Sequence, residues 1–229
     1  MLEVWESAAA LSPVARAVAL GTLARPDLDV DAVERLPLGV RDAALLRFRQ
    51  DRFGDGITCL TNCPTCRAQL EFSLSVASLL AVDKGMVEGG WIDADGVRLS
   101  FRMPCSADLQ AALASGPADD FGDRLLWRCV NGDEAMPALS AAAADRLAAA
   151  IEAADPLSVI WIDLACAACR HAWRSVLDIA VLLWQELDRW ASATLNEISK
   201  LARAYGWGEA EILAMTPGRR RRYLEMVAP

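Results

Sequence analysis

Four cysteines stand in two Cys-x-x-Cys pairs, and their sulfur atoms are the best-placed metal ligands in the sequence. An apolar run leads into each pair, an arginine follows it at once, and a run of alternating apolar and polar residues leads out. Two thiolates at positions i and i+3 of a tight turn, here called a knuckle, converge on one side, and two knuckles can complete a tetrahedron around Zn²⁺. The sequence therefore predicts one structural zinc site with the ligands Cys63, Cys66, Cys166 and Cys169.

The two pairs are far apart along the chain, because residues 67–165 lie between them. Zinc-binding pairs are usually separated by about 15 to 20 residues. The entropy of loop closure grows only with the logarithm of loop length, so the longer connection costs roughly 2 kcal/mol. Structural zinc contributes on the order of 10 kcal/mol or more. A folded insertion between the two halves is therefore compatible with a shared ion.

Other interpretations of the cysteines compete with the zinc site. A redox pair of the thioredoxin type should open a helix, but Leu70, Phe72 and Leu74 follow the first pair with the two-residue period of a strand. Disulfides belong to oxidising compartments, and buried thiols can simply fill apolar space. The repeated flanks favour the shared zinc site. We expect the remaining cysteines to be ordinary buried or half-buried thiols, namely Cys59, Cys105 and Cys129.

The knuckles need strands on both sides, and the surrounding sequence predicts them. Residues 55–76 and 157–179 each have the pattern strand, knuckle, strand, which together makes a split zinc ribbon of β-hairpins. Residues 1–54 predict a helical N-terminal region, with helices beginning at Ser12-Pro13, over 29–36 and over 40–53, the last ending at Gly54. The fold class expected is α+β.

Residues 77–156 form a long mixed α/β insertion between the halves of the ribbon. An Asp95-Gly96 turn, followed by apolar residues at every second position up to Met103, predicts a hairpin. Helices are expected after Ser106, over 123–130 and over 140–154.

The C-terminal region, residues 180–229, predicts a long amphipathic helix followed by two short ones. The apolar stripe expected on the long helix consists of Val181, Trp184, Leu187, Ala191, Leu195, Ile198, Ala202 and Tyr205. Gly206 ends it, and Thr216-Pro217 begins the last short helix. Four consecutive arginines then point all round that helix, so they form either a solvated face or a docking site for an acidic protein or nucleic acid.

Composition and motif content limit the function. The net charge is −8 and the pI is about 4.8, so nucleic acid is an unlikely main partner. No membrane span and no secretory signal are indicated, and we expect a cytoplasmic protein. His171 is the only histidine, and neither a phosphate-binding glycine loop nor a nucleophilic serine turn is present. With no small-molecule substrate suggested, we expect a protein that is not an enzyme.

Several segments together resemble a known family. They are the run from Leu201-Ala-Arg-Ala-Tyr-Gly-Trp to Arg-Arg-Arg-Arg-Tyr-Leu-Glu225, the segments beginning at Gly39 and Phe101, and Asp155-Pro156. With the divided zinc ribbon, they are similar to the baseplate proteins of contractile phage tails, of the T-even phage baseplate hub type, and to proteins of phage-tail-like injection systems. The chain departs from the family pattern at Arg67 and Arg170, where glycine is common, at Ala167, where proline is common, and at Ser199, where histidine is frequent.

The resemblance implies a structural or assembly role, as a baseplate component or a chaperone-like factor that binds other baseplate, hub, spike or tape-measure proteins. Such a protein would be cytoplasmic during assembly and could become part of the particle. The partner-binding residues expected are Trp184, Trp190, Tyr205, Trp207, Arg219, Arg220, Arg221, Arg222 and Tyr223. The alternative is a zinc-ribbon transcriptional regulator that binds DNA through a helix-turn-helix-like segment over residues 212–227. Duplex binding measured against salt separates the two.

Overall fold

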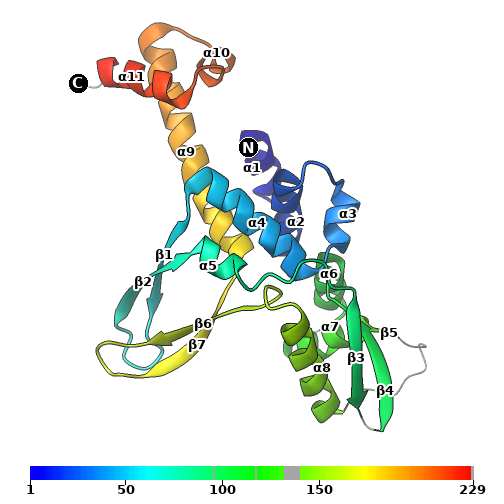
Figure 1. Ribbon diagram of the computed structural model, residues 1–229. Helices are drawn as coiled ribbons and strands as arrows, with labels where there is room; N and C mark the ends of the chain where they lie inside the picture. Colours follow the sequence, from blue (N-terminus) through cyan, green and yellow to red (C-terminus); the bar gives the residue numbers. More distant parts are fainter. Residues whose placement is uncertain (95, 117, 132–139, 228–229) are drawn as a thin grey trace. The chain divides into compact units, whose positions relative to one another are not determined.

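The computed structural model describes residues 1–94, 96–116, 118–131 and 140–227. Helices dominate, and the strands form small antiparallel sheets, which confirms the predicted α+β class (Figure 1). Contacts divide the chain into two compact units. One consists of residues 8–183, and the other combines residues 1–7 with residues 184–229. Each unit is described by itself.

Three helices open the larger unit where the sequence predicts them. α2 (Pro13–Ala24) and α3 (Val30–Arg35) are capped at their N-termini by Ser12 and Asp29. The side chains of these two residues accept hydrogen bonds from backbone amides of the first turn. α4 (Leu38–Phe53) ends at Gly54 with φ of 90°, which glycine adopts without steric cost. α4 begins two residues before the expected start at 40. The largest buried side chains of these helices are Leu20, Val33, Leu45 and Leu46.

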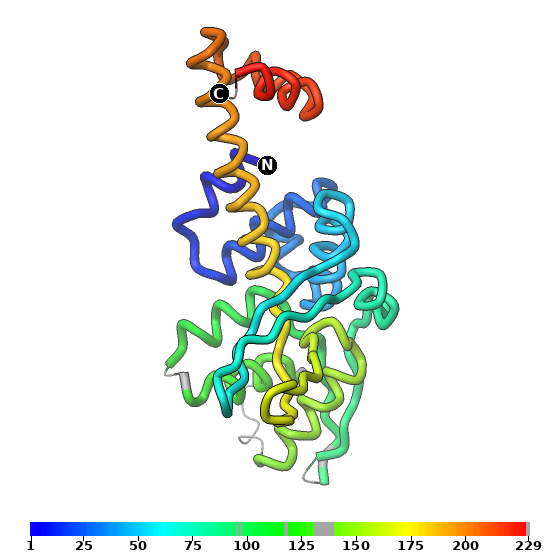
Figure 2. The backbone as a smooth tube through the Cα atoms, turned by 90° about the vertical axis from the view of Figure 1, so that its left-hand side faces the viewer, coloured from blue at the N-terminus to red at the C-terminus, as the bar shows by residue number. Residues whose placement is uncertain are grey.

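The two predicted hairpins of the ribbon are both present. β1 (Gly56–Asn62) pairs with β2 (Gln69–Ser75), which continues into the short α5 (Val76–Leu80), and β6 (Ile160–Ala165) pairs with β7 (Ala172–Leu177). Arg49 of α4 donates to the carbonyl of Gly56 at 2.7 Å and so anchors the start of β1. Figure 2 shows the two hairpins, in cyan and yellow, lying side by side although about a hundred residues separate them in sequence.

The insertion folds as a small sheet with helices. β3 (Gly89–Ala94) pairs with β4 (Val97–Arg102), and β5 (Val130–Asn131) adds a short edge. Asp95 of the predicted turn lies outside the described residues, but the strands on either side of it pair as expected. The helices are α6 (Ser106–Ala114), the 3₁₀ turn η1 (Ala118–Asp120), α7 (Phe121–Cys129) and α8 (Ala141–Ala154). Their core contains Phe101, Met103, Cys129, Leu147 and Ile151.

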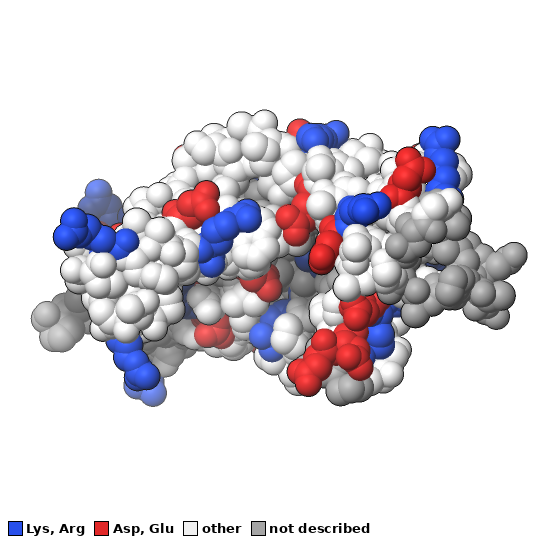
Figure 3. All heavy atoms as spheres, turned by 90° about the horizontal axis from the view of Figure 1, so that it is seen from below, with Lys and Arg blue, Asp and Glu red and all other residues white. Residues whose placement is uncertain are grey.

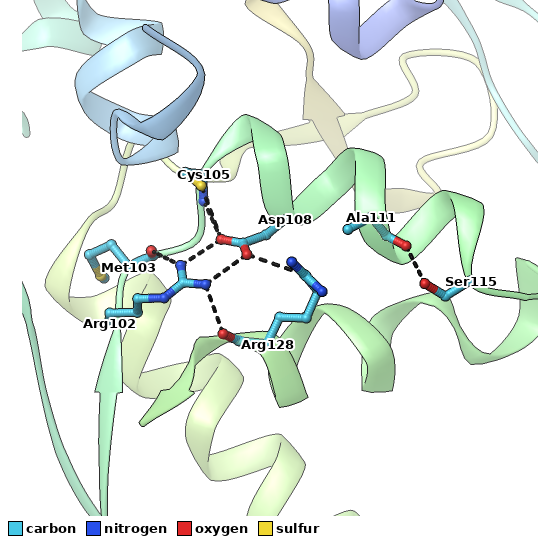
Figure 4. Close-up of polar contacts among 7 residues, drawn as sticks. All are labelled: Arg102, Met103, Cys105, Asp108, Ala111, Ser115 and Arg128. Carbon is cyan, nitrogen blue, oxygen red and sulfur yellow. Dashed lines mark hydrogen bonds and ion pairs between the residues drawn. The ribbon is translucent and has the colours of Figure 1, made fainter. Parts of the chain in front are cut away.

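A buried carboxylate holds the insertion together (Figure 4). Both oxygens of Asp108 accept hydrogen bonds from the guanidinium of Arg102, at 2.6 and 2.7 Å, and Oδ2 also accepts the amide of Cys105 at 3.0 Å. Arg128 adds a third cationic contact at 3.3 Å. Burial alone raises the pKa of this carboxyl, but the bonds from Arg102 and Cys105 outweigh it and lower the pKa of Asp108 to about 2.

The insertion also meets the start of α4. The amide of Leu38 donates to the carbonyl of Pro104 at 2.9 Å, and Nη1 of Arg41 donates to Oγ of Ser106 at 2.8 Å. These contacts use the segments near 39 and 101 that carry part of the family resemblance. One junction of the larger unit therefore joins two stretches that are distant in sequence.

The smaller unit is helical. It contains most of α1 (Leu2–Ala8) and α9 (Ile179–Tyr205), together with α10 (Glu209–Leu213) and α11 (Pro217–Val227). Nε1 of Trp5 on α1 donates to Oδ1 of Asp188 on α9 at 2.8 Å. With 27 residues, α9 is about 40 Å long, and it is the long helix that the sequence predicts for this region.

The apolar stripe predicted for α9 is partly wrong. Val181 and Leu195 are 43% and 37% exposed, respectively. Leu187, Ala191 and Ile198 of the predicted stripe are buried, and the remaining buried positions of this face are Leu183, Thr194 and Leu201. Thr194 belongs to this face because its hydroxyl donates to the carbonyl of Trp190 at 2.8 Å, which satisfies its polar atom inside the helix. Among the described helices, none combines the length and apolar character that a bilayer span requires.

Candidate metal centre

Each knuckle is a tight turn at the tip of a hairpin, closed by the same pair of backbone hydrogen bonds. In the first, the amide of Cys63 donates to the carbonyl of Ala68 and the amide of Arg67 donates to the carbonyl of Cys63, both at 2.9 Å. In the second, the amide of Cys166 donates to the carbonyl of His171 and the amide of Arg170 donates to the carbonyl of Cys166, both at 2.8 Å. The internal repeat seen in the sequence is therefore a repeat of local structure.

The residue after each pair has left-handed backbone geometry. Arg67 has φ of 60° and Arg170 has φ of 62°, and they are the only non-glycine residues with positive φ in the described part of the chain. A side chain in this region costs roughly 1 kcal/mol or more, which glycine avoids. The arginines at these positions keep the turn but make it less favourable.

The structure brings the four predicted ligands into one cluster. All four Sγ atoms lie within 4.8 Å of one another. Sγ of Cys63 is 3.6 Å from Sγ of Cys169, and Sγ of Cys66 is 3.6 Å from Sγ of Cys166. A tetrahedral ion with metal–sulfur bonds of about 2.3 Å requires sulfurs about 3.8 Å apart, whereas a disulfide requires about 2.05 Å. The cluster therefore fits a bound metal ion and does not fit disulfides.

Backbone amides inside the knuckles favour the thiolate form of one cysteine in each pair. The amides of Cys66 and Thr65 donate to the sulfur of Cys63 and lower its pKa to about 6. The amides of Cys169 and Ala168 likewise lower the pKa of Cys166. At Cys169 the amide of His171 has the same effect, but burial and the hydrogen bonds with the other three thiols prevail and raise its pKa to about 12. Complete ionisation of the four thiols therefore calls for a cation in their midst.

Burial differs within each pair. Cys63 and Cys166 are buried, while Cys66 and Cys169 are exposed. His171, the only histidine of the sequence, is outside the cluster. Its ring is exposed and stacks on Trp173 with centroids 6.0 Å apart. Four sulfur ligands complete a tetrahedral coordination sphere and leave no open position on the ion.

No family model, no curated protein and no solved structure matches the chain.

The aromatic residues expected to bind partners at the C-terminus pack against one another. The rings of Tyr205 and Trp207 are stacked with centroids 4.4 Å apart, and Tyr223 meets both edge-on at 5.5 and 4.8 Å. They lie beside the buried residues Ile198, Leu201 and Ile212 and help to hold α10 and α11 on α9. Trp184 and Trp190 are half-buried on α9. A role of these residues in binding partners stays a prediction.

The four arginines of α11 differ in their surroundings. Arg220 is buried, its Nε lies 3.4 Å from Oε2 of Glu197, and its Nη1 donates to the carbonyl of Met215 at 3.2 Å. Arg219 lies over the ring of Tyr223 at 5.7 Å, and Arg222 pairs with Glu225 at 3.3 Å. Arg221 is exposed. Arg220 thus joins α11 to α9, and only the other three point where a partner could reach them.

Sequence reasoning missed a groove between α9 and α11. Its volume is about 640 Å³, and its walls include Lys200 and Arg203 of α9 beside Arg221 and Leu224 of α11. The spacing of Lys200 and Arg203 was a signal that both lie on one face of the helix. Sequence alone did not show that α11 folds back to make the second wall.

Proposed function

We propose that the chain is a structural or chaperone-like assembly component of the baseplate or hub of a contractile phage tail or a phage-tail-like injection system. It would act by binding other proteins in the cytoplasm during assembly, and a structural zinc ion would stabilise it. The observation that supports this most is the four-sulfur cluster, because it ties together two segments separated by a whole folded insertion, as in the family that the sequence resembles.

Zinc is the ion that the donors favour. Four thiolates in tetrahedral geometry suit Zn²⁺ or an iron–sulfur site. The two knuckles have the spacing of a zinc ribbon, and the sulfur–sulfur distances of 3.6 Å fit a single ion. A site of this kind contributes to folding, so its role here would be to fasten the two hairpins to each other.

The ribbon also offers surface for protein contacts. Leu60 on β1 and Val176 on β7 are 63% and 53% exposed, and Trp161 on β6 is 39% exposed with Arg174 stacked over its ring at 4.6 Å. Tryptophan and arginine are enriched in protein interfaces, so the pair of Trp161 and Arg174 is the stronger candidate contact and the exposed Leu60 and Val176 add apolar surface. The partners we propose are other baseplate, hub, spike or tape-measure proteins.

The alternative of a DNA-binding regulator has less support. α10 has five residues, which is short for the first helix of a helix-turn-helix, and Arg220 of the second helix is buried. The chain carries a net charge of −8. On the face shown in Figure 3, basic side chains are interspersed with acidic ones and form no continuous basic patch.

Deleting the gene and imaging the particles tests the proposal. We expect tails that lack a complete baseplate, with assembly restored by the wild-type chain and not by a Cys63→Ser, Cys166→Ser double variant. Normal particles from the deletion strain would overturn the assembly role. In parallel, duplex DNA binding is measured at rising salt. No binding at low salt is expected, and a steep inverse dependence on salt would favour the regulator.

A further inference from the structure

The groove between α9 and α11 is lined by both apolar and charged side chains, and the charged ones are here called the rim. Ala204, Leu224 and Val227 supply apolar surface, and the rim carries Lys200, Arg203 and Arg221 together with Glu197 and Glu225. Along α9 it extends from Asn196 to Ala204, which is about 12 Å or two helical turns. All these residues belong to the smaller unit.

The acidic groups of the rim have ion-pair partners, whereas the described part of the chain provides none for its basic groups. Glu197 lies 3.4 Å from Arg220, and Glu225 lies 3.3 Å from Arg222. Within residues 184–227, none of the acidic side chains lies within ion-pair distance of Lys200, Arg203 or Arg221. The rim therefore presents three uncompensated positive charges on a chain whose net charge is −8.

We propose that this groove binds an amphipathic helix of a partner protein, with apolar residues toward Leu224 and Asp or Glu residues toward Lys200, Arg203 and Arg221. Two observations favour a helix as the partner. The walls of the groove are helices and its length is about two helical turns, as in helix-in-groove recognition. The positive charge of its rim is complementary to acidic residues on the flanks of the partner helix. The inference deepens the proposed function and rests on it, since it specifies the chemistry of the protein that is bound.

An acidic helix suits the groove better than nucleic acid. A phosphate backbone would be attracted to the three cations, but it gains nothing from the apolar lining formed by Ala204, Leu224 and Val227. An amphipathic helix can use both features, because its residues at i, i+3 and i+4 contact the apolar lining while the flanking positions reach the rim.

A displayed library of helical peptides tests the proposal on the full-length, metal-loaded chain. The probes are peptides of about four helical turns with randomised outward positions. We expect the selected peptides to carry an apolar stripe flanked by Asp or Glu. Their affinity, measured by fluorescence anisotropy, should fall at least about tenfold in a Lys200→Glu, Arg203→Glu double variant and should weaken with salt.

Two further variants make the experiment decisive. Arg35→Glu is the control for charge reversal. It replaces a basic residue by an acidic one at an exposed position of α3, outside the groove, and should alter the affinity by less than about twofold. Ala204→Trp keeps every charge but obstructs the groove, so it should also weaken binding at least about tenfold. Circular dichroism and zinc content verify that the variants fold.

The proposal would be overturned if the selected peptides lacked acidic flanks or if the library yielded no binder. It would also be overturned if binding persisted in both groove variants. Duplex DNA binding that disappears in the double variant would overturn it in favour of nucleic acid. Failure of the groove is distinguishable from failure of the assembly role. Normal particles from the deletion strain contradict the assembly role alone, while complete dependence of assembly on the gene with no acidic helix selected contradicts the groove alone.

Discussion

The backbone amide of Gly39 donates a hydrogen bond of 3.0 Å to Oδ2 of Asp155, a residue 116 positions further along the chain. Gly39 lies in the first turn of α4, where amides have no partner within the helix. Asp155, at the end of α8, therefore caps a helix that is remote in sequence and joins the N-terminal helices to the insertion. The carboxylate approaches so closely that there is no room for a side chain at position 39.

Gly39→Ala should destabilise the fold by about 2–3 kcal/mol, because the added Cβ would overlap the Asp155 carboxylate and break its hydrogen bond. Urea denaturation measures the loss. Gly122→Ala is the matched control, because a Cβ at that helical position meets nothing within 4 Å. It should leave stability unchanged or raise it by up to about 1 kcal/mol. Equal behaviour of the two variants would contradict the described junction.

Cys166→Ser should abolish stoichiometric metal binding, because it removes one of the four sulfurs that lie within 4.8 Å of one another. We expect elemental analysis to find about one zinc ion per wild-type chain, and Tm to fall by roughly 10 °C on its loss. Cys59→Ser changes a half-buried cysteine outside the cluster and should keep the metal. Unchanged zinc content in Cys166→Ser would contradict a shared site.

Arg67→Gly should stabilise the metal-loaded protein by about 0.5–1 kcal/mol, because glycine adopts the left-handed φ of 60° without steric cost. Thermal unfolding in the presence of zinc is the measurement. Arg67→Ala is the control for loss of the charge, since alanine keeps the steric cost and should give no comparable gain. Stabilisation by alanine as large as that by glycine would mean that charge, and not backbone geometry, is responsible.

Asp108→Ala should destabilise the protein by about 2–4 kcal/mol, because its carboxylate is almost wholly buried and holds Arg102, Arg128 and the amide of Cys105. Asp163→Ala removes an ion pair with Arg174 in which both side chains are largely exposed, and it should cost less than about 1 kcal/mol. Chemical denaturation of both variants compares the two sites. Similar losses would show that the network around Asp108 is weaker than its burial implies.

The buried Asp42 should give stability an unusual pH dependence. Burial raises its pKa to about 6, even though Arg41 beside it acts in the opposite direction. A carboxyl whose folded pKa exceeds its unfolded value of 3.8 contributes stability at low pH that is lost as pH rises through 6. Relative to Asp42→Asn, the wild type should therefore become more stable between pH 7 and pH 4. The comparison cancels effects of metal loss, and a flat or reversed difference would contradict the burial of a charged Asp42.

Many features of the fold were predictable because their signals are local. Ser12-Pro13 and Asp29 mark helix starts through side-chain caps and proline geometry, and Gly54 and Gly206 end helices with positive φ. The Cys-x-x-Cys spacing identifies both knuckles, because i and i+3 sulfurs on a tight turn converge whatever surrounds them. The predicted pairing of the knuckles depended on the chemistry of the ion, which requires four ligands.

Other features depend on contacts that no local pattern specifies. The sequence of α9 allowed Val181 and Leu195 in its apolar stripe, but the buried face of the helix includes Leu183, Leu187 and Thr194. Arg220 is chemically indistinguishable in sequence from the arginines beside it, and only the return of α11 toward α9 buries it against Glu197. The groove with Lys200 and Arg203 exists for the same reason.

The knuckles, most helix boundaries and the α+β class follow from spacing and periodicity within a few residues, so the amino-acid pattern was enough to predict them. The cap that Asp155 places on α4, the sulfur–sulfur distances of 3.6 Å across the ribbon and the lining of the groove are instead properties of the folded chain. Such relationships arise when distant segments meet, and burial and charge pairing then depend on neighbours that the local sequence does not name.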